Sequence, residues 1–438
     1  MVVNSMSYAK YESYKDSGVD WLGKIPSDWD VEESKWLFSC RKEKANKNDE
    51  QLTASQKYGV IPQQVFMDLE ERRVTVVYLN PEILKHVEKG DFVISMRSFQ
   101  GGIEYCDYTG SVSSAYVPLI PNNLIFSPFF KYLFKSSRYI EALQSTSNLV
   151  RDGQALRYDN FCMIPLPVVP NETQIKIANF LDQKTAQIDQ AIALKQQQIE
   201  KLNEYKQIVI QNAVTKGLDP NAPMKNSGVE WIGNIPEHWD VKKLKYLTSK
   251  IGSGITPSGG ATTYVDKGIP LLRSQNIHFD GLVLDNVANI SLNVHKSMKN
   301  SQVKQHDVLL NITGGSLGRC CYNSSNDEMN VNQHVCIVRP NNLIKGEFLN
   351  GLMSSEVGQK QIWFFQQGGG REGLNFQNLK NFDFPLPSID EQKEIIAHIE
   401  SLKQHFKKSV DNYQTQIDRL KEYKNILINQ AVTGKIKI

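Results

Sequence analysis

The feature that most constrains the fold is a run of 46 residues, 171–216, that contains neither Gly nor Pro. Apolar, small or long-stemmed residues recur there in steps of four and three, which is the heptad spacing of a helical seam. The seam positions are Leu181, Thr185, Ile188, Ile192, Lys195, Ile199, Leu202, Lys206, Val209 and Ala213. A helix of this length spans about 69 Å. It is therefore predicted to be a spacer or a docking rail, with the stems of Lys195 and Lys206 lying along a partly exposed seam.

The chain also contains an internal repeat. The string SGVDWLGKIPSDWDV begins at Ser17, and SGVEWIGNIPEHWDV begins at Ser227, 210 residues later. In each copy of this frame motif, Gly and Pro break helices and two Trp provide apolar anchors. The ends of the copies match as well: KLNEYKQIVIQNAVTKG from Lys201 corresponds to RLKEYKNILINQAVTGK from Arg419, an offset of 218 residues.

The heptad seam recurs at this same offset, at Ile399, Lys403, Phe406, Val410, Tyr413, Ile417, Leu420, Lys424, Leu427 and Ala431. Pro165-Leu166-Pro167 recurs as Pro385-Leu386-Pro387, and Arg151-Asp152-Gly153 as Arg371-Glu372-Gly373, both 220 residues apart. The frame is therefore duplicated, whereas the stretches between these anchors scarcely resemble one another.

The two interior stretches are predicted to be mixed and rich in strands. Short apolar runs at 91–97, 116–120, 307–313 and 334–338 indicate strands, and several of them lead into Gly-rich turns. The segments 126–143 and 346–365 are rich in aromatic residues and are expected to be helical.

Composition excludes several classes of protein. A chain of 438 residues is expected to form two or three domains. No apolar run reaches the length of a membrane span and no signal peptide is evident, so a cytoplasmic location is expected. The six cysteines lack paired spacing, so free thiols are expected and a metal site is not. The net charge of +3 is too small to indicate a nucleic-acid partner by itself.

Catalytic motifs are incomplete. Gly18–Lys24 fits part of a phosphate-binding loop, but Ile25 stands where Ser or Thr would bind magnesium. The Gly-rich run 368–373 does not lead into a helix of a βαβ unit. We therefore expect no catalytic residues in this chain.

The interiors instead contain Arg, Asn, Gln, Ser and Thr beside Gly-rich turns. Arg, Asn and Gln can read base edges, while hydroxyl groups and backbone amides bind phosphate. The candidate DNA-binding residues are Ser95, Arg97, Gln100, Arg151, Arg157, Thr256, Arg273, Gln275, Asn276, Thr313, Ser316, Arg319 and Arg371.

Taken together, these motifs resemble the specificity (S) subunit of type I restriction–modification systems. The resemblance is carried by the two frame motifs, the two Pro-Leu-Pro junctions and the two matching helix ends. The second copy adds the strings 254–258 (GITPS) and 313–319 (TGGSLGR), which are typical of the family's target recognition domains. The first copy departs from them, with 96–102 (MRSFQGG) in the corresponding place.

The resemblance implies an α+β fold with a pseudo-two-fold internal repeat. Two mixed α/β target recognition domains would be separated by two long antiparallel coiled-coil helices. The implied order is an N-terminal segment with the first frame motif (1–31), recognition domain 1 (32–165), the central helix (171–216), a linker with the second frame motif (217–241), recognition domain 2 (242–385) and the C-terminal helix (390–435).

The implied function is non-catalytic. Each recognition domain would read one half of a bipartite, asymmetric target in double-stranded DNA, and the helices would set the spacer and dock two methyltransferase (M) subunits. Whether restriction (R) subunits join is left open. The resemblance implies no cofactor in this chain, with S-adenosylmethionine, ATP and magnesium on partner subunits.

Two alternatives remain open from the residues alone. A duplicated scaffold that binds only proteins would use the same frames and helices. A self-contained nuclease or methyltransferase would need catalytic residues that the motifs do not provide. Steep salt dependence of DNA binding would distinguish the first alternative from a DNA-specificity subunit.

Overall fold

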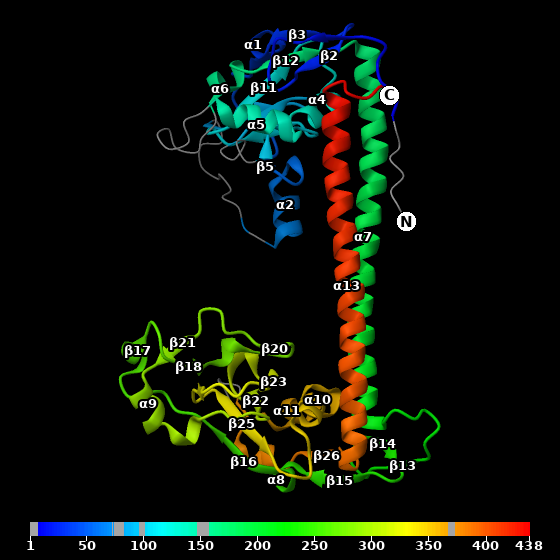
Figure 1. The fold of residues 1–438 in the computed structure, drawn as a ribbon. Coiled ribbons are helices and arrows are strands. Elements are labelled where there is room, and N and C mark those ends of the chain that lie inside the picture. The colour runs from blue at the N-terminus through cyan, green and yellow to red at the C-terminus, as the bar shows by residue number, and fades with distance from the viewer. Residues whose placement is uncertain (1–7, 72, 74–82, 96–100, 147–156, 367–372) are drawn as a thin grey trace. The chain divides into compact units, whose positions relative to one another are not determined.

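The computed structural model describes residues 8–71, 73, 83–95, 101–146, 157–366 and 373–438 (Figure 1). The chain forms two compact units. Unit 1 comprises residues up to 196 together with 414–438, and unit 2 comprises residues 197–413. None of the helices in the described residues has the length and apolar character needed to cross a lipid bilayer.

Unit 1 contains a four-stranded antiparallel sheet in the order β4-β11-β8-β9. The elements from the first frame motif to the central helix are β1 (Tyr14–Asp16), β2 (Lys24–Pro26), β3 (Asp30–Glu33), α1 (Ser34–Leu37), β4 (Phe38–Cys40), β5 (Leu52–Ser55), β6 (Gly59–Pro62), α2 (Gln63–Glu70), β7 (Lys85–Val87), β8 (Phe92–Ile94), β9 (Glu104–Tyr105), β10 (Gly110–Val112), β11 (Val117–Pro121), α4 (Ser127–Leu133), α5 (Ser137–Ser145), α6 (Tyr158–Cys162), β12 (Pro165–Val168) and α7 (Asn171–Lys216).

Unit 2 contains the corresponding sheet, in the order β16-β25-β22-β23, and a second sheet, β17-β21-β18-β24. The elements that follow α7 are β13 (Met224–Asn226), β14 (Asn234–Pro236), β15 (Asp240–Lys243), α8 (Leu244–Leu247), β16 (Thr248–Ser253), η2 (Gly260–Thr263), β17 (Tyr264–Val265), β18 (Ile269–Leu272), η3 (Ser274–Asn276), β19 (Ile277–His278), β20 (Gly281–Leu282), β21 (Ala288–Ile290), α9 (Leu292–Ser297), η4 (Lys299–Ser301), β22 (Val308–Asn311), η5 (Gly314–Ser316), β23 (Cys320–Tyr322), β24 (Asn330–Val331), β25 (Val335–Pro340), α10 (Gly346–Ser354), α11 (Glu356–Phe365), α12 (Phe376–Lys380), β26 (Asp383–Leu386) and α13 (Ile389–Val432).

The four predicted strands are confirmed as β8, β11, β22 and β25. The two predicted helical segments are each divided into two helices, α4 with α5 and α10 with α11. In unit 1 the division occurs at Ser136, whose side-chain oxygen accepts a hydrogen bond from the backbone N–H of Tyr139 and so caps a new helix. Periodicity alone did not reveal these breaks, because the apolar pattern continues across them.

A buried Arg–Asp ion pair stands at the start of the same strand in both sheets. Asp91 precedes β8 and binds Arg41 through both carboxylate oxygens, at 2.7 and 3.0 Å. Asp307 precedes β22 and binds Arg339 in the same way, at 2.7 and 2.8 Å. Arg41 follows edge strand β4, whereas Arg339 belongs to β25. The ion pair is thus retained in both units, although its arginine comes from different strands.

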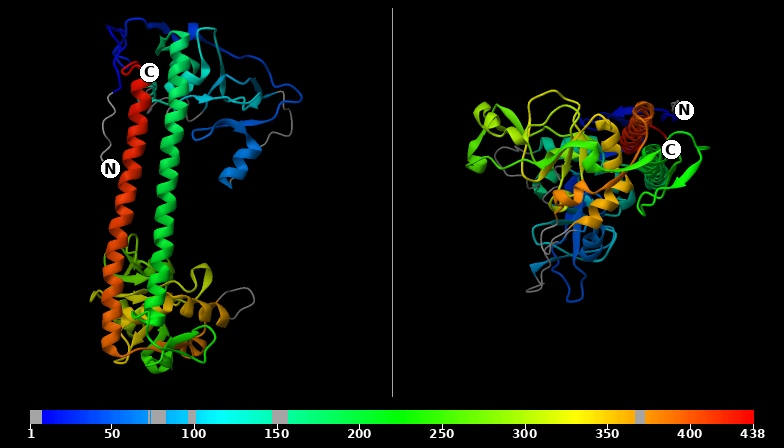
Figure 2. Two further views of the ribbon diagram at one scale, coloured as in Figure 1. Left: turned by 90° about the vertical axis from the view of Figure 1, so that its right-hand side faces the viewer. Right: turned by 90° about the horizontal axis from the view of Figure 1, so that it is seen from below.

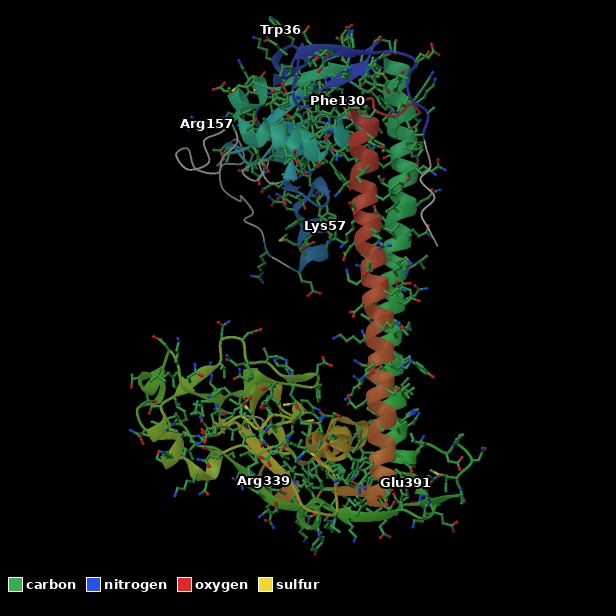
Figure 3. All side chains as sticks on the ribbon, in the orientation of Figure 1. Trp36, Lys57, Phe130, Arg157, Arg339 and Glu391 are labelled. Atoms are coloured by element: carbon green, nitrogen blue, oxygen red, sulfur yellow. The ribbon has the colours of Figure 1, made fainter. Side chains whose placement is uncertain are left out.

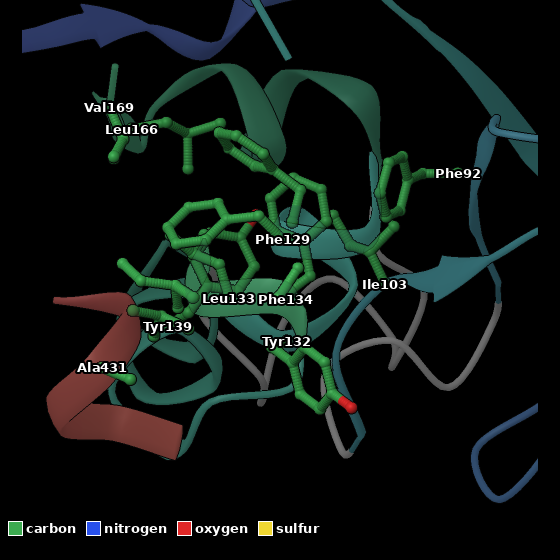
Figure 4. Close-up of a cluster of buried hydrophobic side chains, with 14 of the residues drawn as sticks. Phe92, Ile103, Phe129, Tyr132, Leu133, Phe134, Tyr139, Leu166, Val169 and Ala431 are labelled. Carbon is green, nitrogen blue, oxygen red and sulfur yellow. The ribbon is translucent and has the colours of Figure 1, made fainter. Parts of the chain in front are cut away.

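The core of unit 1 is rich in phenylalanine (Figure 4). The rings of Phe92 and Phe134 meet edge to face at 5.0 Å between centroids, a favoured aromatic geometry. Ala431 of α13 is fully buried and belongs to the same cluster as Leu133 and Tyr139. The last turns of α13 therefore complete the core of unit 1.

The C-terminal end of α7 has the equivalent role in unit 2. Ala213 and Val214 are buried in one cluster with Trp239 and Phe348. Each unit thus combines its own frame motif and globular region with the start of the long helix that follows them and the end of the other long helix.

Within each unit, α7 and α13 run antiparallel and side by side (Figures 1 and 2). In unit 1 the ammonium of Lys424 binds Asp189 at 2.6 Å, and that of Lys195 donates to Gln416 at 2.6 Å. In unit 2 the rings of Tyr205 and Phe406 meet at 5.9 Å. All ten predicted seam positions of α7 are buried or half-buried. The predicted coiled coil is confirmed within each unit.

The long helices end at left-handed glycines. The predicted bounds of α7 are confirmed, with Gly217 following at φ +78°. For α13 the predicted end at Lys435 was wrong, because the helix ends at Val432. Gly434 adopts φ +70°, and Lys435 donates its backbone N–H back to Gln430, which terminates the helix.

A buried glutamine ties the start of each long helix to its globular region. The amide nitrogen of Gln174 donates to the carbonyls of Leu124 and Val169, both at 2.8 Å, while its oxygen accepts from the Phe126 N–H. Gln392, 218 residues later, makes the same three bonds, to the carbonyls of Leu343 and Pro387 and from the N–H of Lys345. These bonds replace those that the enclosed backbone groups would make with water.

The offset of 218 also holds in the strand before each helix. Pro165 of β12 faces Glu33, and Asp383 of β26 faces Lys243, the residue equivalent to Glu33. Pro165 therefore corresponds to Asp383, and the Pro-Leu-Pro strings lie two residues out of register. The offset of 220 inferred from these strings was wrong for this junction.

The starts of α7 and α13 differ in one contact to the frame motif. This difference predicts that the same kind of substitution has unequal effects at the two helices. In unit 2, Glu391 accepts hydrogen bonds from Trp239 Nε1 and His238 Nε2, both at 2.9 Å. In the described part of unit 1, Trp29 Nε1 is buried without a partner, and Thr173 stands where Glu391 stands in unit 2. Glu391→Ala is expected to lower the free energy of unfolding by about 1–3 kcal/mol, because it leaves the indole N–H of Trp239 unpaired.

Urea unfolding measures this effect, and Thr173→Ala is the control. The control is expected to change the free energy of unfolding by less than about 0.5 kcal/mol. Equal losses in the two variants would contradict the assignment of Glu391 as a specific anchor of the frame motif.

Candidate nucleic-acid interface

The loop between β22 and β23 in unit 2 is narrow at its base and open at its tip. At the base, the N–H of Asn311 donates to the carbonyl of Arg319 at 2.8 Å, and the N–H of Gly318 donates to the carbonyl of Asn311 at 3.0 Å. At the tip, added Cβ atoms on Gly314 and Gly315 would meet no neighbouring atom within 4 Å. The loop therefore exposes its backbone and is fixed at both ends.

Hydrogen bonds bring two further segments to this loop. The side chain of Asn311 donates to the carbonyl of Ser274 at 2.9 Å, which joins the loop to the turn at η3. Thr313 contacts the ring of His334, and Thr256 donates to the side-chain oxygen of Gln333. The candidates Thr256, Gln275, Thr313, Ser316 and Arg319 thus come from three segments that are linked to one another.

Arg319 is the strongest candidate for contact with a base or phosphate. It is half-buried at the end of the loop, and its backbone N–H donates to the carbonyl of Ser316. Its guanidinium has no carboxylate partner among the residues that the structure describes. Five N–H donors thus remain for a ligand, and this arrangement suits guanine or phosphate.

Arg273 and Asn276 have different environments. The guanidinium of Arg273 lies 5.9 Å from the ring centre of Tyr264, and its Nε is buried without a partner among the described atoms. Asn276 is only 1% exposed. Its side-chain oxygen accepts from the N–H of Arg273, and its nitrogen donates to the carbonyl of Val283, so Asn276 shapes the turn and has no free group to read a base.

In unit 1 the equivalent loop joins β8 to β9. Ser95, at its start, is 7% exposed and is therefore placed to support the loop rather than to face a ligand. Arg157 is exposed immediately before α6 (Figure 3). Arg97, Gln100 and Arg151, and Arg371 of unit 2, lie outside the described residues.

A buried ion pair supports the far end of the unit 1 loop. The ammonium of Lys135 binds Glu104 at 2.6 Å and donates to the carbonyl of Gly101 at 2.7 Å. Burial raises the pKa of Glu104 to about 7, although the ammonium of Lys135 acts to lower it. In unit 2, the end of the loop is held by Gln359 of α11, which donates to the carbonyl of Gly318 at 2.9 Å.

Sequence reasoning missed the supporting residues Glu104 and Lys135 in unit 1 and Asn311, Gln333, His334 and Gln359 in unit 2. The run from Asn332 to His334, which is the first residue of a predicted strand, was the only local signal, and it identified no partner. Their roles depend on contacts between segments that are distant in the sequence. Among the described residues, no group of His, Cys, Asp and Glu could hold a metal ion. What the site offers is hydroxyls, amides, guanidinium groups and exposed backbone.

Comparison with known proteins gives a consistent result. The model of the type I restriction modification DNA specificity domain matches twice, at residues 26–204 and 236–422. The EcoBI specificity subunit of Escherichia coli is 28% identical over 296 residues, covering 64% of this chain and 61% of that protein. The MjaVIII specificity subunit of Methanocaldococcus jannaschii is 25% identical over 446 residues, covering 99% of this chain and 98% of that protein.

Solved structures share the fold. The HsdS subunit of Thermoanaerobacter tengcongensis aligns with a TM-score of 0.53 and 15% identity, over 94% of this chain and 98% of that one. A chain from a structure describing complex assembly and conformational transition of the type I R-M system aligns with a TM-score of 0.66 and 13% identity, over 93% of this chain and 98% of that one.

Proposed function

The chain belongs to the type I restriction–modification DNA specificity family, and from this premise we propose that it directs such a system to its target. It is a DNA-recognition subunit with two recognition domains and is not an enzyme. Each domain reads one half of a bipartite, asymmetric sequence in double-stranded DNA. The alternative of a scaffold that binds only proteins is not favoured by its relatives.

The proposal rests on a type of sheet that occurs once in each unit and has a different loop in each. Sheets β4-β11-β8-β9 and β16-β25-β22-β23 share strand order and direction. The connection from β8 to β9 nevertheless differs in sequence from the connection from β22 to β23. A sheet that is repeated in both units but presents different loops, each with Arg and amide side chains, suits recognition of two different half-sites.

Methylation mapping of a genome tests the proposal directly. Cells with this chain and its methyltransferase partner should carry methylated adenines or cytosines within one bipartite motif, and cells without the chain should not. The purified complex should also lose affinity steeply as salt rises, because DNA contact releases counterions. An unchanged methylation pattern would refute the proposal.

The partners follow from the same family. Methyltransferase subunits, one for each domain, supply catalysis and S-adenosylmethionine. Restriction subunits, where the system has them, supply ATP- and magnesium-dependent steps. The chain itself binds the DNA target and sets the distance between the two half-sites.

A duplicated apolar face on the long helices supports this proposed docking. Ile208 of α7 is 57% exposed, and its counterpart Ile426 of α13 is 46% exposed. They lie in closely similar parts of the two copies, 204–210 and 422–428. Exposed isoleucines at equivalent positions suit a partner that is present twice.

Ile208→Glu is expected to remove one methyltransferase subunit from the complex, and Ile208→Glu with Ile426→Glu to remove both. Truncating or charging a central apolar contact costs at least about 2 kcal/mol, roughly 30-fold in affinity. Native mass spectrometry of the assembled complex would count the subunits.

Leu194→Glu is the control, since Leu194 is also exposed on α7 but corresponds to Asn412 in the other copy. Loss of subunits in this variant, or full assembly of the double variant, would place the docking face elsewhere.

A further inference from the structure

A chain of hydrogen bonds connects two of the candidate DNA-binding hydroxyls. The hydroxyl of Thr256 donates to Gln333 Oε1. The amide nitrogen of Gln333 lies 3.0 Å from His334 Nε2, and His334 Nδ1 lies 2.7 Å from the hydroxyl oxygen of Thr313. Thr256 and Thr313 thus stand at the two ends of one path through Gln333 and His334.

With the amide of Gln333 in the orientation found here, the chemistry of the groups sets the direction of every bond in this path. An amide NH2 can only donate, so His334 Nε2 accepts. The imidazole then carries its proton on Nδ1 and donates it to Thr313. The hydroxyl hydrogen of Thr313 is then available to donate to a ligand. The hydroxyl of Thr256 donates its hydrogen to Gln333, so it can only accept a hydrogen bond from a ligand.

The backbone holds the central residue in place. The N–H of His334 donates to Asn332 Oδ1 at 3.0 Å, and its carbonyl accepts from the N–H of Ile312, also at 3.0 Å. These bonds come from both sides of the residue. The imidazole is therefore anchored between the β22–β23 loop and the segment before β25.

Reversal of the path requires three coordinated changes. The amide of Gln333 must turn over, the proton of His334 must move from Nδ1 to Nε2, and both hydroxyls must rotate. Thr256 then becomes the outward donor and Thr313 the outward acceptor. In either direction one hydroxyl donates to a ligand while the other accepts.

We propose that His334 is a specificity-determining positioning residue that couples Thr256 and Thr313, so that the surface offers one donor and one acceptor. In the direction found here, Thr313 donates and matches purine N7, guanine O6 or thymine O4, and Thr256 accepts and matches an amino group of adenine or cytosine. This inference rests on the proposed function of unit 2 as a reader of one half-site.

The test is a double-mutant cycle measured in two backgrounds. Thr256→Val, Thr313→Val and the double variant are compared by DNA binding of the assembled methyltransferase–specificity complex. The duplex carries the target found by methylation mapping. The same three variants are then measured with His334→Phe, which keeps a ring but removes both nitrogens.

Each single change is expected to weaken binding about tenfold with His334 present. Because the hydroxyls act as one unit, the double variant should lose about 10- to 30-fold rather than the hundredfold product. With Phe at position 334 the losses should multiply. His334→Gln, which retains one donor and one acceptor, should restore part of the coupling.

Controls separate coupling from unfolding. All variants should unfold cooperatively well above the temperature of the binding assay, and all should bind like wild type to a duplex in which the half-site read by unit 2 is scrambled. Independent, multiplying losses in both backgrounds, or no loss in any variant, would overturn the coupling while leaving the proposed function intact. Absence of sequence-specific binding by the wild-type complex would overturn the proposed function as well.

Discussion

Replacing Arg319 by Ala is expected to weaken binding to the target by roughly 5- to 150-fold, about 1–3 kcal/mol if one bidentate base contact is lost. The guanidinium ends a loop that is fixed at its base, and within the described residues it has no acidic partner. The loop therefore holds it ready for a ligand with little ordering cost. Binding of the assembled complex to duplexes with each base substituted in turn would measure the loss.

The same measurements distinguish a base contact from a phosphate contact. Loss of a base contact relaxes specificity at one position, whereas loss of a phosphate contact weakens all duplexes alike and lowers the salt slope by about one. Arg157→Ala in unit 1 is the matched variant and should affect only the other half-site. Full specificity at both half-sites in both variants would refute the assignment of these arginines.

Deleting one heptad from both long helices is expected to abolish methylation at the natural target, a loss of at least about 100-fold. Residues 198–204 of α7 and 407–413 of α13 suit the deletion. They lie within unit 2, and the Tyr205–Phe406 contact places them along facing parts of the two helices. Removing seven residues preserves the seam and shortens each helix by about 10.5 Å.

This length corresponds to about three base pairs at roughly 3.4 Å each. A library of duplexes with spacers of different length should therefore show an optimum at a shorter spacer. Deletion from only one helix is the control, since it shifts one side of the seam against the other and should prevent folding of the coiled coil. An unchanged optimum in the double deletion would refute the proposal that the helices set the spacer.

The long helices and the repeated frame were predictable because their signals are local and periodic. The seam, the absence of Gly and Pro, and the terminal Gly217 define α7 to the residue. The end of α13 was less predictable. The match between the two helix ends extends the prediction to Lys435, but the left-handed Gly434 and the bond from the Lys435 N–H to the Gln430 carbonyl end the helix at Val432.

The candidate site was only partly predictable. Residue type suggested hydroxyls and arginines beside Gly-rich turns, and the structure places Thr313, Ser316 and Arg319 in one loop. Residue type could not show that Asn276 is enclosed by its own turn. Nor could it identify His334, whose ring contacts Thr313, 21 residues before it, and Gln333, the residue directly before it.

The Arg–Asp ion pairs show the same limitation in the core. Asp91 and Asp307 occupy equivalent positions, but Arg41 and Arg339 do not. A comparison of the two copies residue by residue misses the pair, because what is retained is a buried charge balance and not a position. Three-dimensional contacts are needed to recognise it.

The exchange of helix ends between the units has a consequence for synthesis of the protein. Unit 1 needs residues 414–438 to complete its core, and these emerge after all of unit 2. Between the emergence of residue 196 and that of residue 414, the ribosome adds 218 residues, which takes on the order of 10–45 s at ~5–20 residues per second. During this interval the apolar seam at Leu181 and Ile188 lacks the partner that buries it. The nascent chain is therefore expected to engage chaperones during translation, and unit 2, whose residues 197–413 are contiguous, is expected to complete its folding before unit 1 does.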